Sequence, residues 1–298
     1  MAPSSTIECT DLTFELGGKV ILKNLNLALP TASRTLLVGA NGAGKSTLLR
    51  LLAGKRLVKD GACRVDGKRA FFEPVPGLTY LGTEWATNPV VRGDIAVSQL
   101  LQSAGVDKHR ERAKELLEVM DVNPLWHMNA VSDGERRRVQ IVMGLLAPWS
   151  VLLLDEVTVD LDAVVRSDLL AWLKAETERR GATILYATHI YDGLGEWPTH
   201  VAHMAFGSIA HLRSLTPGGF PELEAVLPAS GSAGTSFNAN SPLLLAVTGW
   251  LRADLASRRA RGQQYDPGHD ERGHVGEKKF GVVERSPQES YNYWAGRD

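Results

Sequence analysis

The chain has 298 residues, of which 44% are apolar, and its 33 basic and 34 acidic side chains give a formal net charge of −1. This length suits one large domain, or one domain with an appendage. A near-neutral charge provides no electrostatic footprint for binding nucleic acid, so we expect no direct nucleic-acid partner. Two cysteines exclude a disulfide scaffold, and no apolar run reaches the ~18–20 residues of a membrane span. We expect a cytoplasmic protein without membrane insertion, and residence in the nucleus is left open.

The first two-thirds of the chain alternates short apolar runs with helical patterns, which is typical of βα units. We expect buried strands at 36–39, 151–154 and 183–188, because runs that are apolar throughout fit a parallel sheet covered on both faces. Apolar residues at helical spacing predict a helix over 45–53 and a helical insertion at about 85–146. The predicted fold class is α/β with a parallel-sheet core and a helical subdomain.

The composition changes near residue 224 and becomes rich in Gly, Ser, Ala and Asn over 228–242, which indicates a linker. An amphipathic helix is expected next, over 243–261, with an apolar stripe at 244, 247, 251 and 255 and Trp250 beside it. The stripe includes an acidic residue, Asp254, and lacks a broad basic face, which favours docking on a protein surface over a membrane. We therefore expect a first domain at 1–226 and an appendage at 227–298, composed of linker, helix and polar tail.

The segment between the strand at 36–39 and the helix at 45–53 fits the pattern G-x-x-x-x-G-K-[ST]. Glycines let backbone N–H groups converge on phosphate oxygens, and the helix N-terminus adds partial positive charge. Lys45 supplies a point charge for the β- and γ-phosphates, and Ser46 supplies a hydroxyl ligand for Mg²⁺. A glycine-rich turn with a chance lysine is the alternative, and the strand–loop–helix context argues against it. The predicted residues that bind a nucleoside triphosphate are Gly39, Ala40, Asn41, Gly42, Ala43, Gly44, Lys45, Ser46 and Thr47.

Two acids, Asp155 and Glu156, follow the strand at 151–154. A carboxylate at the end of that strand can hold Mg²⁺ opposite Ser46, usually through water. Glu156 is expected to orient the attacking water and accept its proton, a contribution of about 10²–10⁴-fold in rate. Acid pairs at strand ends also cap neighbouring helices, and the catalytic interpretation depends on the phosphate-binding segment nearby.

The stretch Val131–Val139, VSDGERRRV, resembles the signature sequence of the ATP-binding cassette (ABC) ATPases, usually Leu-Ser-Gly-Gly-Gln followed by a basic run. Ser132 and Gly134 match this signature, whereas Asp133 and Glu135 depart from it. Ser132 with Glu135 three residues later also fits a capping box, and both interpretations hold together.

The resemblance covers about residues 7–226 and implies a P-loop fold of the ABC type with ATP and Mg²⁺ as ligands. It implies that Val159–Asp162 is the D-loop, which crosses to a partner subunit, and that His189 senses the γ-phosphate. It also implies a homodimer in the ATP state, in which Ser132 and Gly134 meet the triphosphate bound by the other chain.

Two features depart from the family pattern. The glutamine expected before the helical insertion is absent, and Thr83 stands nearest its position. Leu16 falls where an aromatic side chain usually stacks on adenine, and Phe14 lies two residues away on the same strand face. With YLGTEW and VSDGERRRVQ, the motifs resemble a non-transporter subgroup, namely the fungal ABC ATPase associated with the CCR–NOT transcription-regulation complex and its plant relatives. A role in such a complex is what this resemblance implies.

One run of arginines and one pair of histidines are not assigned to a functional site. We interpret Arg136–Arg138 as one solvated helix turn with the family's structural basic residue, rather than as a nucleic-acid patch. His200 and His203 lie three residues apart in an apolar stretch without acidic or cysteine companions, which argues against a metal site.

Three functional hypotheses follow from these motifs. The first is a homodimerising ABC ATPase that acts as a nucleotide-gated switch within a regulatory assembly. The second is the ATP-hydrolysing subunit of a multi-chain ABC membrane transporter, coupled to its membrane chains near residues 80–100. The third is a scaffold that binds ATP with little turnover, which the departures at Asp133 and Thr83 leave open.

Overall fold

The computed structural model describes residues 5–58, 62–82, 92–191, 193–224 and 242–261 of the chain. The chain divides into two compact units, residues 1–255 and 256–298, and the sheets and helices below belong to the first unit up to residue 255. Of the second unit only residues 256–261 are described. Thr83, the predicted linker up to residue 241 and the polar tail from residue 262 onward lie outside the described residues.

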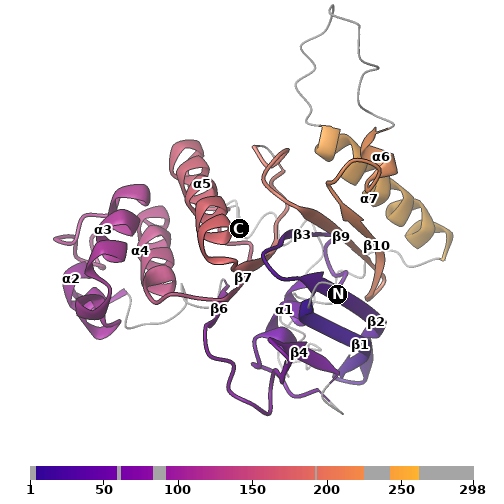
Figure 1. The fold of residues 1–298 in the computed structure, drawn as a ribbon, viewed down its shortest axis with the longest axis horizontal. Coiled ribbons are helices and arrows are strands. Elements are labelled where there is room, and N and C mark those ends of the chain that lie inside the picture. Colours follow the sequence, from indigo (N-terminus) through magenta and orange to yellow (C-terminus); the bar gives the residue numbers. More distant parts are fainter. Residues whose placement is uncertain (1–4, 59–61, 83–91, 192, 225–241, 262–298) are drawn as a thin grey trace, which may run out of the picture. The chain divides into compact units, whose positions relative to one another are not determined.

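A six-stranded sheet forms the centre of the first unit, with the strand order β10-β9-β3-β8-β7-β6 (Figure 1). Neighbouring strands are parallel except β9 and β10, which run antiparallel. Strands β3, β7 and β8 are buried along their whole length. The predicted α/β class with a parallel-sheet core is confirmed. The strands are β3 (Arg34–Val38), β6 (Leu78–Leu81), β7 (Val151–Asp155), β8 (Thr183–Ala187), β9 (His200–Ala205) and β10 (Ser208–Ser214).

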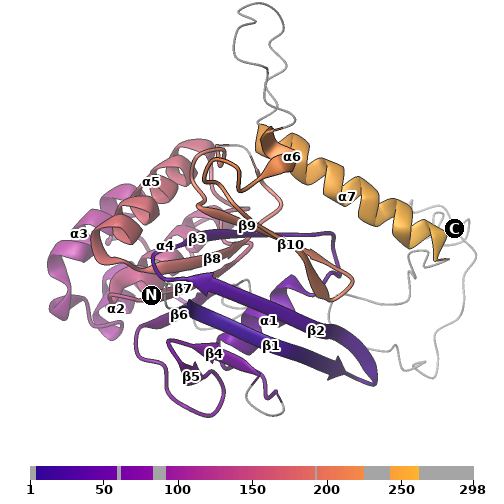
Figure 2. The same cartoon turned by 45° about the vertical axis from the view of Figure 1, so that its right-hand side comes forward.

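A second, four-stranded antiparallel sheet has the order β2-β1-β4-β5 and lies beside the first (Figure 2). Its strands β1 and β2 form a long hairpin that turns at Gly17 and Gly18, whose φ angles of 58° and 78° glycine adopts without steric cost. The sequence patterns described above do not predict this sheet: its β1–β2 hairpin is local and closes at two glycines, whereas the pairing of β1 with β4 joins distant segments. The strands are β1 (Ser5–Leu16), β2 (Lys19–Pro30), β4 (Cys63–Val65) and β5 (Lys68–Arg69).

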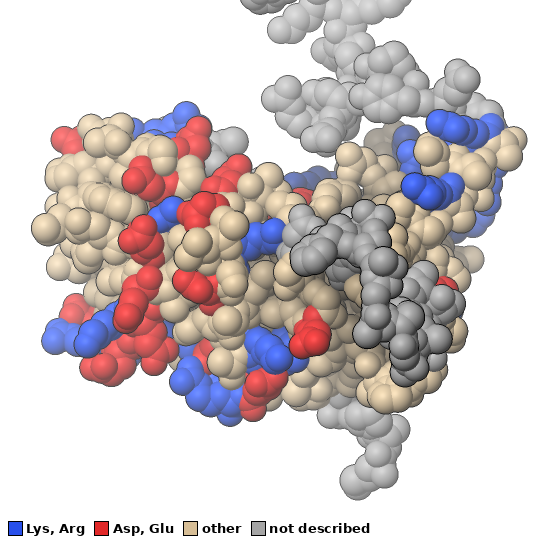
Figure 3. All heavy atoms as spheres, turned by 90° about the horizontal axis from the view of Figure 1, so that it is seen from above, with Lys and Arg blue, Asp and Glu red and all other residues tan. Residues whose placement is uncertain are grey.

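The helices cover the central sheet, and α2, α3 and α4 gather at its β6 end (Figure 1). The side chain of Asp162 accepts the N–H groups of Val164 and Val165 at 3.1 and 3.0 Å, which begins α5, and Gly181 with φ 66° ends it. Over these helices, acidic and basic side chains lie among one another on the face shown in Figure 3. The helices are α1 (Lys45–Leu52), α2 (Val97–Ser103), the 3₁₀ helix η4 (Val106–Lys108), α3 (Arg110–Val119), α4 (Asp133–Leu146), α5 (Ala163–Arg180), α6 (Pro221–Glu224) and α7 (Pro242–Ala260).

Two buried apolar clusters lie on opposite faces of the six-stranded sheet, because side chains alternate along each strand. One contains Leu37 and Leu153 together with α1 and the antiparallel sheet. The other contains Leu36 and Leu152 together with α2 to α5 and α7. Within the described part of the chain, no helix combines the length and hydropathy of a bilayer span.

Helix α7 packs on the second cluster, across β9 and β10 (Figure 2). Of the predicted apolar stripe of this helix, Val247 is buried in the cluster, and Leu244 and Leu251 pack against it. The stripe is wrong only in its last member, Leu255, which is 43% exposed. The ring of Trp250 decides the buried face, since it stacks on His203, His211 and Phe220 at centroid distances of 5.0, 5.2 and 5.2 Å. The buried residues of α7 are Leu243, Ala246, Val247, Trp250 and Asp254.

Asp254 belongs to the buried face of α7 because its carboxylate has a partner on β9, His203. Oδ2 of Asp254 lies 2.9 Å from Nε2 of His203, and both side chains are largely buried. His203 is therefore part of the contact between α7 and the sheet.

Candidate functional site

The glycine-rich segment connects β3 to α1, and two of its glycines, Gly39 and Gly44, stand where no side chain fits. Gly44 has a φ of 106°, and a Cβ at this position would lie 2.7 Å from Cδ2 of Leu22 in β2. A Cβ on Gly39 would lie 2.3 Å from the carbonyl oxygen of Met204 in β9. The loop is therefore packed tightly between β2 and β9, while Asn41 remains exposed at its tip.

Lys45 is the first residue of α1, and its side chain is turned back over the loop. It is 7% exposed, and its Nζ donates hydrogen bonds to the carbonyl oxygens of Gly39 at 2.8 Å and Ala40 at 3.3 Å. Burial lowers the pKa of Lys45, and the two carboxylates that end β7 oppose this shift. A largely dehydrated ammonium group among main-chain atoms is a strong attractor for an anionic oxygen.

Ser46 and Asp155 meet across the gap between α1 and β7. The hydroxyl of Ser46 donates to Oδ1 of Asp155 at 3.0 Å, and the hydroxyl of Tyr80 donates to Oδ2 at 3.3 Å. Burial raises the pKa of Asp155, and the hydrogen bond from Ser46 works in the opposite direction. Sequence reasoning missed Tyr80 as a partner of this carboxylate. Its place on β6, the parallel neighbour of β7, brings it to Asp155, and no pattern within the sequence signals this pairing.

Glu156 has an unusual backbone conformation, with a φ of 54°. A non-glycine residue in the left-handed region carries a cost of about 1–3 kcal/mol, and such residues gather at functional sites. The main chain is held in this conformation, since the N–H of Glu156 donates to the carbonyl oxygen of Ala187 at 3.0 Å. Burial raises the pKa of Glu156, which makes its carboxylate a better proton acceptor.

The ring of His189 lies between the lysine and the glutamate. Its Nε2 is 3.1 Å from Oε1 of Glu156 and 3.3 Å from Nζ of Lys45. Burial, and next the charge of Lys45, lower the pKa of His189, so the neutral ring is favoured. A neutral Nε2 either accepts from Lys45 or donates to Glu156, so the tautomer of His189 decides which of the two it supports.

The structure thus brings together Lys45, Ser46, Asp155, Glu156 and His189 in one cluster. Ser132 and Gly134 lie elsewhere, at the start of α4, which is on the other side of β7 from α1 in Figure 1.

The start of α4 is a capping box, one of the two interpretations that the sequence offered for Ser132. The hydroxyl of Ser132 accepts the N–H of Glu135 at 3.2 Å, and the Glu135 carboxylate accepts the N–H of Ser132 at 2.8 Å. Gly134 approaches the segment after β7, because a Cβ there would lie 3.0 Å from the carbonyl oxygen of Asp160.

The interpretation of Arg136–Arg138 as a solvated helix turn is wrong for two of the three residues. Arg136 is 9% and Arg137 is 4% exposed. Both guanidinium groups donate to main-chain carbonyl oxygens inside the protein, which compensates their loss of water. Only Arg138 lies toward the surface, where it pairs with Asp121 and Asp162.

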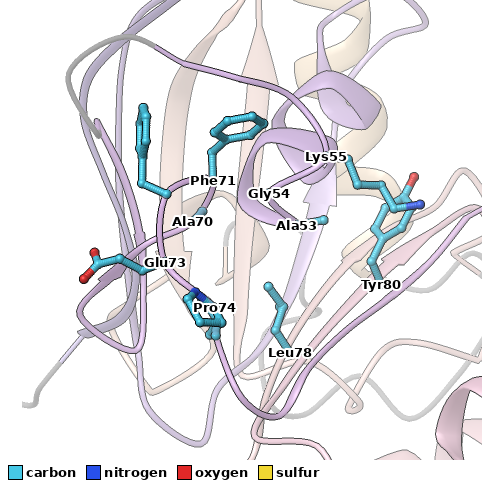
Figure 4. Close-up of a pocket in the computed structure, with 11 residues that line it drawn as sticks. Ala53, Gly54, Lys55, Ala70, Phe71, Glu73, Pro74, Leu78 and Tyr80 are labelled. Atoms are coloured by element: carbon cyan, nitrogen blue, oxygen red, sulfur yellow. The ribbon is translucent and has the colours of Figure 1, made fainter.

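Leu16, the residue at the expected adenine position, ends β1 and is 42% exposed. Phe14 is half-buried and packs against the cluster under the antiparallel sheet. A cavity of about 510 Å³ is lined by Tyr80 and Lys55, and Nζ of Lys55 is 4.6 Å from the centroid of the Tyr80 ring (Figure 4). None of the sequence-predicted site residues lines this cavity.

A phosphate-binding loop between β3 and α1, with an acid pair at the end of β7, defines a P-loop nucleoside triphosphatase. Comparisons with known proteins narrow this class. The family model described as ABC transporter matches residues 22–159. Among curated proteins, CCR4-associated factor 16 of Saccharomyces cerevisiae is 46% identical over 227 residues, covering 70% of this chain and 78% of that protein. ABC transporter I family member 20 of Arabidopsis thaliana is 40% identical over 284 residues, covering 88% and 80%.

Among solved structures, a dimeric bacterial ABC transporter cassette matches with a TM-score of 0.60 at 19% identity, covering 70% of this chain and 99% of the cassette. At that identity the match shows the fold alone. The curated relatives show the family, and the chain belongs to the ABC ATPases. The resemblance inferred from its motifs is confirmed, and as a member of this family the chain binds and hydrolyses ATP.

Proposed function

We propose that this ABC ATPase is not a transporter subunit but a nucleotide-gated homodimeric switch, working in a gene-regulation complex of the CCR–NOT type. The name of its yeast relative, CCR4-associated factor 16, supports the proposed association with such a complex. The ATPase domain is assigned to residues 1–226, and residues 227–298 are assigned to an appendage whose helix α7 packs on that domain. The protein is assigned to the cytoplasm, and the nucleus is proposed as a second location.

The phosphates of ATP are bound by the loop and by the start of α1. Lys45 is the main cationic contact, since its buried Nζ exchanges carbonyl oxygens for phosphate oxygens of higher charge. Leu16 lies at the end of β1 and is assigned to the adenine. The residues assigned to the phosphates are Gly39, Ala40, Asn41, Gly42, Ala43, Gly44, Lys45, Ser46 and Thr47.

Ser46 and Asp155 fit the ligand set of Mg²⁺. Their oxygens lie 3.0 Å apart, and both are the hard oxygen ligands that this ion prefers. The described residues contain no group of three or more His, Cys, Asp or Glu side chains suited to a metal ion, so phosphate oxygens and water are expected to complete the coordination. When bound there, Mg²⁺ would neutralise charge on the β- and γ-phosphates.

Hydrolysis depends on Glu156 and His189. Glu156 accepts the proton of the attacking water, a role for which its raised pKa is suited. The neutral His189, 3.1 Å from Oε1 of Glu156, holds that carboxylate in place and is close enough to Lys45 to respond to the phosphate bound there.

The position of the remaining site residues supports dimerisation, and this observation carries the proposal. Ser132 and Gly134 are at the start of α4, separated from the phosphate loop by β7 (Figure 1). A triphosphate held by one chain is therefore expected to meet the Ser132 and Gly134 of a second copy, and a two-fold interface satisfies both sites at once. Binding of ATP closes the dimer, and hydrolysis reopens it.

The test uses Glu156→Gln, which retains the shape of the side chain and removes its ability to accept a proton. With ATP and Mg²⁺ the variant should bind nucleotide, lose turnover by about 10²–10⁴-fold, and sediment as a dimer in analytical ultracentrifugation. The matched control adds Lys45→Ala to the same chain, which removes the main phosphate contact and should leave a monomer.

The two parts of the proposal fail separately. Turnover at the unmodified rate in Glu156→Gln would show that another group is the base. A monomer at high protein concentration, with saturating ATP and Mg²⁺, would refute the nucleotide-gated dimer.

A further inference from the structure

Arg137 is a buried guanidinium group that the catalytic cluster does not include. It lies in the second turn of α4, is 4% exposed, and forms no ion pair with a carboxylate of the described residues. Its charge is retained inside the protein because an arginine side chain does not lose its proton there. A charged group without a carboxylate partner is costly to bury, so its other contacts must compensate.

Those contacts are main-chain carbonyl oxygens on two separate segments. Nη1 of Arg137 donates to the carbonyl oxygen of Gly82 at 2.9 Å, at the end of β6. Nε donates to the carbonyl oxygen of Val157 at 3.1 Å, and Nη2 donates to that of Glu156 at 3.2 Å. Gln140, one turn further along α4, supports this arrangement by accepting from Nη1 of Arg137 and by donating to Gly82 at 3.0 Å.

The carbonyl of Glu156 belongs to the residue in left-handed conformation. Its N–H is already fixed by the carbonyl oxygen of Ala187 in β8, and Arg137 fixes its carbonyl from the opposite side. The next carbonyl, that of Val157, is held by the same guanidinium. The direction of the Glu156 side chain follows from the backbone that these three hydrogen bonds hold.

We propose that Arg137 is a positioning residue for ATP hydrolysis: it holds the main chain of Glu156 in the conformation that points the carboxylate at the attacking water. This inference rests on the proposed role of Glu156 as the base. A general base is effective only when its oxygen lies within hydrogen-bond reach of the proton that it takes, so a small change in backbone angle lowers the rate.

The neighbouring Arg136 provides a matched control. It is on the same helix, is 9% exposed, and also donates to main-chain carbonyl oxygens, at 3.0 Å for Met128 and 2.9 Å for Val131. These carbonyls precede α4 and are not part of the acid pair. Loss of Arg136 therefore removes a buried arginine from α4 without releasing Glu156.

The experiment compares Arg137→Met, Arg137→Lys and Arg136→Met in the full chain. Arg137→Met should lower kcat by about tenfold or more and leave the Kd for a non-hydrolysable ATP analogue within about threefold, because the phosphate contacts are intact. Arg137→Lys retains the charge and part of the hydrogen bonding, and should recover part of the rate. Arg136→Met should stay within about threefold of the unmodified kcat.

A double-mutant cycle separates positioning from general damage. In single-turnover assays, Arg137→Met should change the residual rate of Glu156→Gln by less than about twofold, because the group that it positions has already lost its function. Equal loss of rate in both backgrounds, an unchanged kcat in Arg137→Met, or an equal loss in Arg136→Met would overturn the inference.

Misfolding and failure of the proposed function are also distinguishable. If Arg137→Met does not fold, Arg137→Lys carries the test through the same cycle, and an unchanged kcat in that variant counts against positioning. If Glu156→Gln itself retains turnover, the proposed base is wrong. If it does not, and Arg137→Met is fully active, only this inference fails.

Discussion

Replacement of Trp250 by alanine tests whether α7 is an integral part of the first compact unit. The side chain is 7% exposed and stacks on His203 and His211 from the sheet and on Phe220. The variant removes all three ring contacts, and none of the residues assigned to ATP lies among them. The expected effect is therefore on stability, with the Kd for ATP unchanged.

The size of the effect follows from burial. An aromatic side chain buries about 150–250 Å². At about 25 cal/mol per Å² this corresponds to roughly 4–6 kcal/mol as an upper estimate. Substitutions of buried Phe or Trp by Ala cost about 3–5 kcal/mol, since part of the cavity collapses. We expect Trp250→Ala to lower the free energy of unfolding by about 3–5 kcal/mol.

Urea denaturation, followed by far-UV circular dichroism, measures this free energy. The matched control is Leu255→Ala, in the same helix at 43% exposure, which should cost no more than about 0.5 kcal/mol. The comparison also tests the register of α7, because the stripe predicted from the sequence includes Leu255 and places Trp250 beside it. A loss below about 1 kcal/mol for Trp250→Ala, or equal losses for the two variants, would refute the packing of α7 through its Trp250 face.

Two further predictions concern activity and partners. Burial raises the pKa of Glu156 above its usual 4.5, and a general base acts only when it is deprotonated. We therefore expect kcat/KM to fall on acidification with a midpoint above pH 4.5. A midpoint at or below that pH in a pH–rate profile would contradict the role of Glu156 as a buried base. Affinity purification of the full chain should recover subunits of a CCR–NOT-type complex, and recovery of a membrane protein with several spans instead would favour the transporter alternative.

The parts of the site that the sequence predicts are those whose geometry is local. The loop from Gly39 to Thr47 needs only a strand before it, a helix after it and glycines at the positions of positive φ, and all of these are neighbours in the chain. Asp155 and Glu156 follow directly from the end of a buried strand. Parallel strands then place that end beside the loop, which is why the cluster was predictable as a whole.

Contacts between distant segments were not predictable in this way. Tyr80 reaches Asp155 because β6 pairs with β7, and no pattern within either strand indicates the pairing. Asp254 lies on the buried face of α7 because His203 is opposite it, whereas a search for apolar spacing passes over a carboxylate. The register of an amphipathic helix is decided by such polar pairs as well as by its apolar side chains.

The burial of Arg137 beside Glu156 was likewise not predictable from the sequence. A run of three arginines predicts a solvated surface, since a charged side chain is buried only where enough acceptors surround it. The acceptors of Arg137 are carbonyl oxygens that leave no trace in the amino-acid sequence, because every residue has one. Two of these carbonyls, those of Glu156 and Val157, lie where the backbone leaves the regular strand conformation immediately after β7, and the third, that of Gly82, lies just after the end of β6. The irregular backbone at Glu156 therefore accompanies two of the acceptors that allow the arginine to be buried, and the charge pattern of the sequence does not indicate them.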